Sequence, residues 1–185
     1  MFKIVSLRKL DEPDLELMLS WRNHPIVRAG MFSQGVIELH QHKAWFRRES
    51  QKKDSAWFLF VDMNEKPAGV VYFTEMDRIA NHAFWGFYAA PDAPQGTGTQ
   101  MGVEALDYIF NEEQFHKINA EVLESNARSY KFHRKLGFRT EGTFCDHYFG
   151  SGGYESVTRF ALLAREWPAH RKELFRFLKT FSGRE

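Results

Sequence analysis

The chain has 185 residues, 43% of them hydrophobic, which is the length and composition of one ordinary folded domain. Its 25 Lys and Arg nearly balance its 24 Asp and Glu, so the net charge of +1 excludes the strong basic field that nonspecific nucleic-acid or membrane binding needs. The single cysteine, Cys145, excludes an intramolecular disulfide and a cysteine-rich zinc site. We therefore expect one domain over residues 1–185, cytoplasmic, with no signal peptide and no bound metal.

Hydrophobic periodicity and turn signals predict the elements in chain order. The prediction is a strand at 2–7, helices at 11–23 and 39–50, strands at 57–61, 68–73 and 82–89, a helix after the loop at 95–99, a strand at 118–123, a helix at 126–136, strands at 138–149 and 154–163, and a helix at 166–181. Antiparallel hairpins combined with one crossover connection predict an α+β fold.

The loop at residues 95–99 reads Gln-Gly-Thr-Gly-Thr and lies between a predicted strand and a predicted helix. Gly96 and Gly98 let main-chain N–H groups approach an anion closely, and the helix dipole adds partial positive charge at the same end. A pyrophosphate group fits such a site. On its own, the run is also compatible with a plain strand-to-helix connection.

A second motif runs from the strand that contains Glu121 into Asn126 and a helix that ends in Leu136-Gly137-Phe138. Gly137 is typical of the left-handed conformation that stops a helix. Together, the two motifs resemble the GNAT family of N-acetyltransferases, and the resemblance covers about residues 3–163. It implies a central mixed, mostly antiparallel sheet that is splayed between its fourth and fifth strands, with helices on both faces.

The resemblance also implies that acetyl-CoA is the cosubstrate. The residues implied in its binding are Phe87, Ala89, Gln95, Gly96, Thr97, Gly98, Thr99, Asn126 and Arg128. The family loop usually reads Gln or Arg, two residues, Gly, one residue, then Gly or Ala. Counting to Gly96 and Gly98 puts Ala93 in the first position, whereas counting from Gln95 puts Gln100 where a small residue is expected. Both registers of the pyrophosphate loop stay open at this point.

Amine acetylation needs a base for the amine and an acid for the departing thiolate. Glu121, on the strand before Asn126, is the candidate base, with its side chain either in the cleft or in solvent. His133 occupies the position where many family members carry the tyrosine that protonates the thiolate, and Tyr88 is the competing acid. Each acid candidate also has an ordinary interpretation, His133 as a surface or packing histidine and Tyr88 as a buried structural tyrosine.

The segment from Trp21 to Trp45 is rich in aromatics, methionine and cations, and in this family it covers the acceptor groove. Its Trp-Arg-Asn-His-Pro run, followed by Met-Phe-Ser, resembles the family members that acetylate the 4-amino group of UDP-4-amino-4,6-dideoxy-N-acetyl-β-L-altrosamine in pseudaminic acid biosynthesis, for surface or flagellin glycosylation. Arginine and histidine suit phosphates, and flat or soft apolar groups suit uracil. The expected acceptor residues are Arg22, His24, Met31, His42, Trp45, Tyr72 and Thr74.

Two other functions stay open. A polyamine or protein N-terminal amine acetyltransferase of the same fold would need carboxylates in its acceptor site rather than arginine and histidine. A noncatalytic acetyl-CoA-binding module is conceivable because of His133 and the irregular loop. The expected partner is a UDP-amino sugar, with no nucleic acid and no membrane, and a homodimer is compatible with the sequence.

Overall fold

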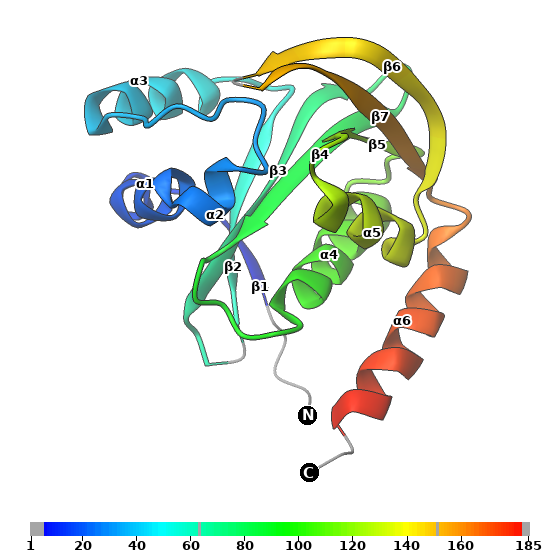
Figure 1. Cartoon of the computed structure of the whole chain (residues 1–185). Helices are drawn as coiled ribbons and strands as arrows, with labels where there is room; N and C mark the ends of the chain where they lie inside the picture. The colour runs from blue at the N-terminus through cyan, green and yellow to red at the C-terminus, as the bar shows by residue number, and fades with distance from the viewer. Residues whose placement is uncertain (1–5, 63, 151, 183–185) are drawn as a thin grey trace.

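The computed structural model describes residues 6–62, 64–150 and 152–182 and contains one seven-stranded sheet in the order β1-β2-β3-β4-β5-β7-β6 (Figure 1). Neighbouring strands are antiparallel except β4 and β5, which are parallel. The strands are β1 (Ser6–Lys9), β2 (Ala56–Val61), β3 (Pro67–Asp77), β4 (His82–Ala89), β5 (Lys117–Leu123), β6 (Arg139–Gly150) and β7 (Gly153–Leu163). The helices are η1 (Glu12–Asp14), α1 (Leu15–Asn23), α2 (Pro25–Arg28), α3 (Leu39–Glu49), α4 (Thr97–Asp107), η2 (Tyr108–Glu112), α5 (Ala127–Leu136) and α6 (Trp167–Ser182).

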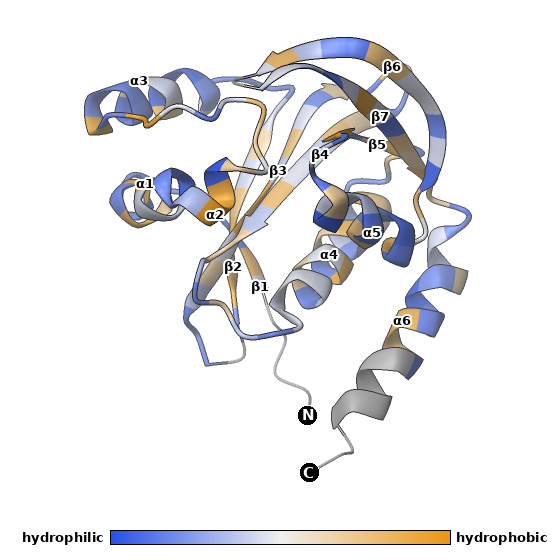
Figure 2. Ribbon diagram, in the orientation of Figure 1, coloured by the Kyte–Doolittle hydropathy of each residue, from blue (hydrophilic) through white to orange (hydrophobic). Residues whose placement is uncertain are grey.

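Helices cover both faces of the sheet, with α1, α2 and α3 on one face and α4, α5 and α6 on the other (Figure 1). The central strands are largely hydrophobic (Figure 2), because each of their sides meets a core. In β2, Phe58 and Phe60 belong to the core beneath α4, whereas Leu59 belongs to the core beneath α1. We call these two sides of the sheet the α4 face and the α1 face.

Strands β4 and β5 pair over only a short stretch. The ladder joins His82 to Lys117, Ala83 to Ile118 and Phe84 to Asn119, and it stops there although β4 continues to its end at Ala89. The two strands therefore separate toward their carboxyl ends. This confirms the expected mixed sheet that is splayed between its fourth and fifth strands, with helices on both faces.

The predicted elements agree with the structure except at a few places. The first strand is described from Ser6, and residues 2–5 of the prediction lie outside the described residues. Helix α1 ends at Asn23, as predicted. Pro25, two residues later, begins the short helix α2, because proline fits the first position of a helix. At four residues, α2 is too short for hydrophobic periodicity to reveal. The end of α4 widens into the π-helical turn η2.

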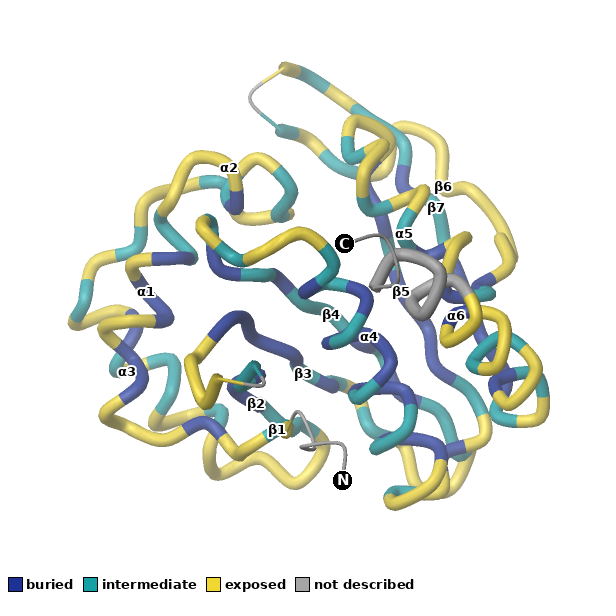
Figure 3. The backbone as a smooth tube through the Cα atoms, turned by 90° about the horizontal axis from the view of Figure 1, so that it is seen from below, coloured by how far each residue is buried: buried dark blue, intermediate teal, exposed yellow. Residues whose placement is uncertain are grey.

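The β6–β7 hairpin forms one edge of the sheet, and β6 is exposed along most of its length (Figure 3). Gly137 ends α5 with a φ of 96°, the left-handed stop that the sequence predicts. Within the described part of the chain, no helix is long and apolar enough to cross a membrane.

Candidate active site

The separation of β4 from β5 sets the centre of the candidate site. Beyond Phe84 the side chains of β4 alternate, so that Trp85 and Phe87 lie on the α4 face and Tyr88 lies on the α1 face. Because β5 no longer pairs with this edge of β4, main-chain N–H and C=O groups there are available to an extended ligand. The pantetheine arm of acetyl-CoA carries amide groups and fits such an edge, where Phe87 and Ala89 are the expected contacts.

The glycine loop leads directly into α4. Gly96 is the N-cap of α4 with a φ of 97°, a left-handed conformation that favours glycine, and Gly98 lies in the first helical turn. Both glycines therefore lie where an anion would meet the start of the helix.

Only some of the loop amides are available to a pyrophosphate. Thr97 and Thr99 already donate their N–H groups to loop carbonyl oxygens, at N···O distances of 3.1 and 2.9 Å. The N–H groups of Gln95, Gly96 and Gly98 donate to no residue that the structure describes. Within residues 95–99, the amides that can still bind the pyrophosphate are therefore those of Gln95, Gly96 and Gly98.

Helix α5 brings a positive charge to this loop. The Nζ of Lys135 donates to Oγ1 of Thr99 at 2.9 Å, and the side chain of Thr99 is buried. Burial lowers the pKa of Lys135. The sequence reasoning did not single out Lys135, although it belongs to the Lys-Leu-Gly-Phe end of the second motif and could have been found there.

Asn126 caps α5 and ties it to the loop that follows α2. Its Oδ1 accepts a hydrogen bond from the N–H of Ser129 at 3.0 Å, and its Nδ2 donates to the carbonyl oxygen of Gly30 at 3.2 Å. A Cβ at Gly30 would lie 2.8 Å from that Nδ2, so a glycine keeps the contact close. Asn126 therefore orders one end of the cleft, and Arg128 lies exposed beside it in the first turn of α5.

His133 is buried beneath the gap between β4 and β5. Its ring lies 5.6 Å from that of Trp85 on β4 and stacks at 5.4 Å on Phe160 of β7. Burial lowers the pKa of the imidazole to about 4, so the ring is neutral at pH 7. Nδ1 lies 2.8 Å from the carbonyl oxygen of Ser129, which requires Nδ1 to carry the single proton, and Nε2 has no partner among the described residues. This geometry argues against His133 as the proton donor.

Tyr88 and Tyr72 lie together on the α1 face beside the separated part of β4. Burial, followed by the neighbouring Tyr72, raises the pKa of Tyr88 well above its ordinary value, so the phenol keeps its proton. The hydroxyl of Tyr88 is buried and has no partner within the described chain. Tyr72 covers Gly86 so closely that any Cβ at that position would overlap the Tyr72 ring. Tyr88 is therefore the better placed of the two acid candidates.

Glu121 lies on the α1 face of β5, beyond the last residue that pairs with β4. Its directly opposite neighbour on β7 is Arg159, whose Nε and Nη2 donate to Oε1 of Glu121 at 3.1 and 2.6 Å. The side chain of Glu121 is 29% exposed, so it is neither buried nor fully in solvent. The sequence reasoning missed Arg159, because only the strand register brings it opposite Glu121.

Aromatic rings form a continuous stack on the α1 face. His42 stacks on Trp45 at 5.0 Å, Trp45 meets the edge of Trp57 at 4.6 Å, and Trp57 stacks on Tyr72 at 4.2 Å. The structure thus brings together His42, Trp45 and Tyr72 from the expected acceptor set. Trp57 was not expected there, although its place in the alternation of β2, opposite Tyr72, could have indicated it.

The same face collects buried polar atoms that have no hydrogen-bond partner among the described residues. They are Nη1 of Arg22, Nε of Arg28, Nε2 of His42, Nε1 of Trp57 and the hydroxyl of Tyr88. We call these five residues the donor cluster. Burial lowers the pKa of Arg22, and burial together with the nearby Arg22 lowers the pKa of His42. A buried donor without a partner costs free energy, so the cluster favours a ligand rich in acceptor atoms.

The loop between α2 and α3 lies over this cluster and is fixed at several points. Nη2 of Arg22 donates to the carbonyl oxygen of Ser33 at 2.5 Å, and the hydroxyl of Tyr148 on β6 donates to the carbonyl oxygen of Phe32. Met31, from the same loop, packs against the core beneath α1. The contribution of this loop to the acceptor site stays a prediction.

His24 and Thr74 do not join the donor cluster. His24 is exposed, and its Nδ1 accepts the N–H of Ile26 at 3.3 Å as the N-cap of α2. Its expected contact with the acceptor stays a prediction. Thr74 instead lines a neighbouring cavity of about 330 Å³ together with Trp45 and Trp57. The remaining residues around this cavity are Glu49, Lys52, Asp54, Ser55 and Glu75.

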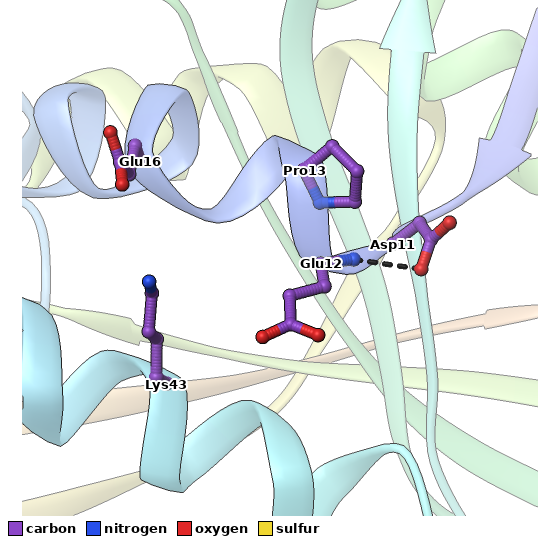
Figure 4. A pocket seen from close by; sticks show the side chains of 5 residues that line it. All are labelled: Asp11, Glu12, Pro13, Glu16 and Lys43. Atoms are coloured by element: carbon purple, nitrogen blue, oxygen red, sulfur yellow. Dashed lines mark hydrogen bonds between the residues drawn. The ribbon is translucent and has the colours of Figure 1, made fainter.

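A second cavity, of about 530 Å³, opens between the start of α1 and α3 (Figure 4). Its lining residues are Asp11, Glu12, Pro13, Glu16 and Lys43, none of which belongs to the expected site. Across the described residues, no group of three or more His, Cys, Asp or Glu side chains is arranged to hold a metal ion.

Residues 5–139 match the family model described as the acetyltransferase (GNAT) domain. The chain belongs to this family and is an N-acetyltransferase that uses acetyl-CoA as its acetyl donor. The match confirms the resemblance and the class of enzyme that the sequence indicates, and it favours an enzyme over a noncatalytic binding module.

Individual relatives are similar at comparable levels. The chain is 25% identical over 138 residues to acetyltransferase PseH of Campylobacter jejuni (strain 81-176), covering 75% of this chain and 85% of the relative. It is 23% identical over 169 residues to spermidine N(1)-acetyltransferase of Escherichia coli (strain K12), covering 91% of this chain and 90% of the relative. The crystal structure of spermidine N-acetyltransferase from Vibrio cholerae in complex with CoA and spermine has a TM-score of 0.82 at 22% identity, covering 88% of this chain and 97% of that chain.

Proposed function

We propose that this enzyme acetylates the amino group of a nucleotide-linked amino sugar, in the chemical class of UDP-4-amino-4,6-dideoxy-N-acetyl-β-L-altrosamine in pseudaminic acid biosynthesis. One observation carries the proposal, namely that the donor cluster combines two arginines with the indole N–H of Trp57, the hydroxyl of Tyr88 and the ring of His42, and contains no carboxylate. A diphosphate supplies the acceptor oxygens and the negative charge that such donors require. The similarity to PseH points the same way.

Two carboxylates on elements around this face are paired with arginines. Glu121 is paired with Arg159, and the buried Asp14 accepts two hydrogen bonds from Arg8, at 2.7 and 2.6 Å. A polyamine would bring several positive charges to a surface that already holds Arg22 and would find no unpaired buried carboxylate within the cluster. The stack that contains Trp57 and Tyr72 instead offers flat faces suited to a nucleobase or a sugar ring.

In this proposal the amine attacks the thioester directly, and no covalent intermediate forms with the enzyme. Glu121 accepts the proton that the amine loses, through a water molecule, and Tyr88 gives a proton to the thiolate that leaves. Acetyl-CoA supplies the activated acetyl group when bound. The amides of Gln95, Gly96 and Gly98 hold its pyrophosphate at the start of α4.

Polyamine acetylation is the second candidate, and one structural feature favours it. The cavity of about 330 Å³ next to the aromatic stack combines the rings of Trp45 and Trp57 with the carboxylates of Glu49, Asp54 and Glu75. Carboxylates and ring faces both attract ammonium groups. Lys52, however, lies in the same cavity and pairs with Glu49 at 2.6 Å, which removes part of that attraction.

A thiol-release assay with acetyl-CoA distinguishes the two candidates. We expect the 4-amino UDP-altrosamine to give a higher kcat/KM than its gluco-configured isomer, than spermidine and than a peptide with a free N-terminus. UDP should inhibit competitively against the amino sugar. Faster acetylation of spermidine, together with no inhibition by millimolar UDP, would replace this proposal with the polyamine function.

A further inference from the structure

Arg159 binds Glu121 in an asymmetric way. Both of its hydrogen bonds, from Nε and Nη2, go to Oε1, and Oε2 accepts none from the residues that the structure describes. A guanidinium group that bridged both oxygens would occupy the whole carboxylate. Here one oxygen of Glu121 is fixed and the other stays available on the α1 face of the sheet.

The guanidinium group is itself held in place by aromatic rings. Its central carbon lies 4.4 Å from the ring centroid of Phe84 on β4 and 5.6 Å from that of Phe144 on β6. Phe84 is also the last β4 residue to pair with β5. Arg159 is therefore anchored at the point where the two strands separate.

We propose that Arg159 is a positioning residue for acetyl transfer, which fixes Oε1 of Glu121 so that Oε2 faces the acceptor amine or its bridging water. This inference rests on Glu121 acting as the base, as in the proposed function, but not on the identity of the acceptor. Arg159 touches neither substrate in this role and acts through Glu121.

The test uses the full chain and whichever amine gives turnover, so that it stays valid if the acceptor is not a nucleotide sugar. The variants are Arg159→Gln, Glu121→Gln and their double substitution, with Arg159→Lys as a second choice if Arg159→Gln does not fold. Arg78→Gln is a matched control, because Arg78 also pairs with a glutamate, Glu113, and also lies 4.4 Å from a phenylalanine ring centroid, that of Phe115.

We expect Arg159→Gln to lower kcat by about 10- to 100-fold while the KM for acetyl-CoA changes less than about twofold. The double variant should be no slower than Glu121→Gln, and Arg78→Gln should keep the wild-type kcat and KM. Additive losses in the double variant, or an unchanged kcat in Arg159→Gln, would show that Arg159 only supports the sheet and would overturn the proposal.

Discussion

Nδ1 of His133 lies 2.8 Å from the carbonyl oxygen of Ser129, one turn earlier in α5, and burial lowers the pKa of this imidazole to about 4. In the unfolded chain the group has its ordinary pKa of 6.5, so between these two values the unfolded state binds more protons than the folded state. The stability that the neutral ring contributes is therefore present above about pH 6.5 and is lost as the pH falls toward 4.

Replacing His133 with Phe should remove this pH dependence. Between about pH 7 and about pH 4.5, the free energy of unfolding of the wild type should fall by roughly 2 to 3 kcal/mol more than that of His133→Phe. Urea denaturation at the two pH values measures the difference. Equal losses in both proteins would show that the ring is not held neutral by burial.

The same variant tests the role of His133 in the reaction. Because the neutral ring has no proton on Nε2 to give, His133→Phe should keep kcat within a few-fold of the wild type. A folded variant with kcat lowered by about 100-fold or more would restore His133 as the acid. Steady-state rates with saturating acetyl-CoA provide the comparison.

Most helices and strands could be predicted because each depends on local periodicity and on local stop signals. Gly137 is an example, since a glycine after a run of helix-forming residues is enough to indicate the end of α5. The glycine loop before α4 is equally local. The splay between β4 and β5 came from the family resemblance and not from periodicity, which does not report which strands lie side by side.

The contacts between distant segments could not be predicted in the same way. The pairing of Glu121 with Arg159 depends on the register of two strands that are far apart in the sequence. The burial of His133 depends on rings from β4 and β7, and the use of His24 as a helix cap depends on the backbone of α2. Each of these contacts depends on how distant segments pack together. The residue pattern along a single segment does not indicate that packing.

The glycine loop yields a test of the acetyl-CoA site. A Cβ at Gly98 would lie 3.8 Å from Phe132, an ordinary contact, so Gly98→Val should fold with nearly unchanged thermal stability. The branched side chain should crowd the approach of a phosphate to the amide and weaken CoA binding about tenfold, or about 1.4 kcal/mol. Titration calorimetry with CoA measures the change. Gly142→Val on the exposed strand β6, where a Cβ meets nothing within 4 Å, is the control and should bind CoA as the wild type does.

The donor cluster, together with Met31 of the loop between α2 and α3, yields a test of the acceptor site. Arg22→Met, His42→Ala and Met31→Ala should each raise the KM for the nucleotide sugar by about tenfold, or about 1.4 kcal/mol, while the KM for acetyl-CoA stays nearly constant. Nη1 of Arg22 is buried and has no partner among the described residues, so it is free to bind a phosphate oxygen. Loss of this arginine should therefore also weaken inhibition by UDP. Arg47→Met, on the exposed side of α3, is the matched control. An equal rise of KM in Arg47→Met and Arg22→Met would place the effect outside the donor cluster.

Tyr88→Phe should separate catalysis from folding. The hydroxyl is buried without a partner among the described residues, so its removal should leave the free energy of unfolding unchanged or raise it slightly. If the phenol protonates the departing thiolate, kcat should fall by about 100-fold or more while the affinity for CoA stays the same. Burial raises the pKa of Tyr88 above its ordinary value, so its ionisation should add no basic limb to the wild-type rate profile near neutral pH. Rates, CoA titrations and urea denaturation of the same preparation provide the three readouts, and a variant as fast as the wild type would show that the proton comes from another group.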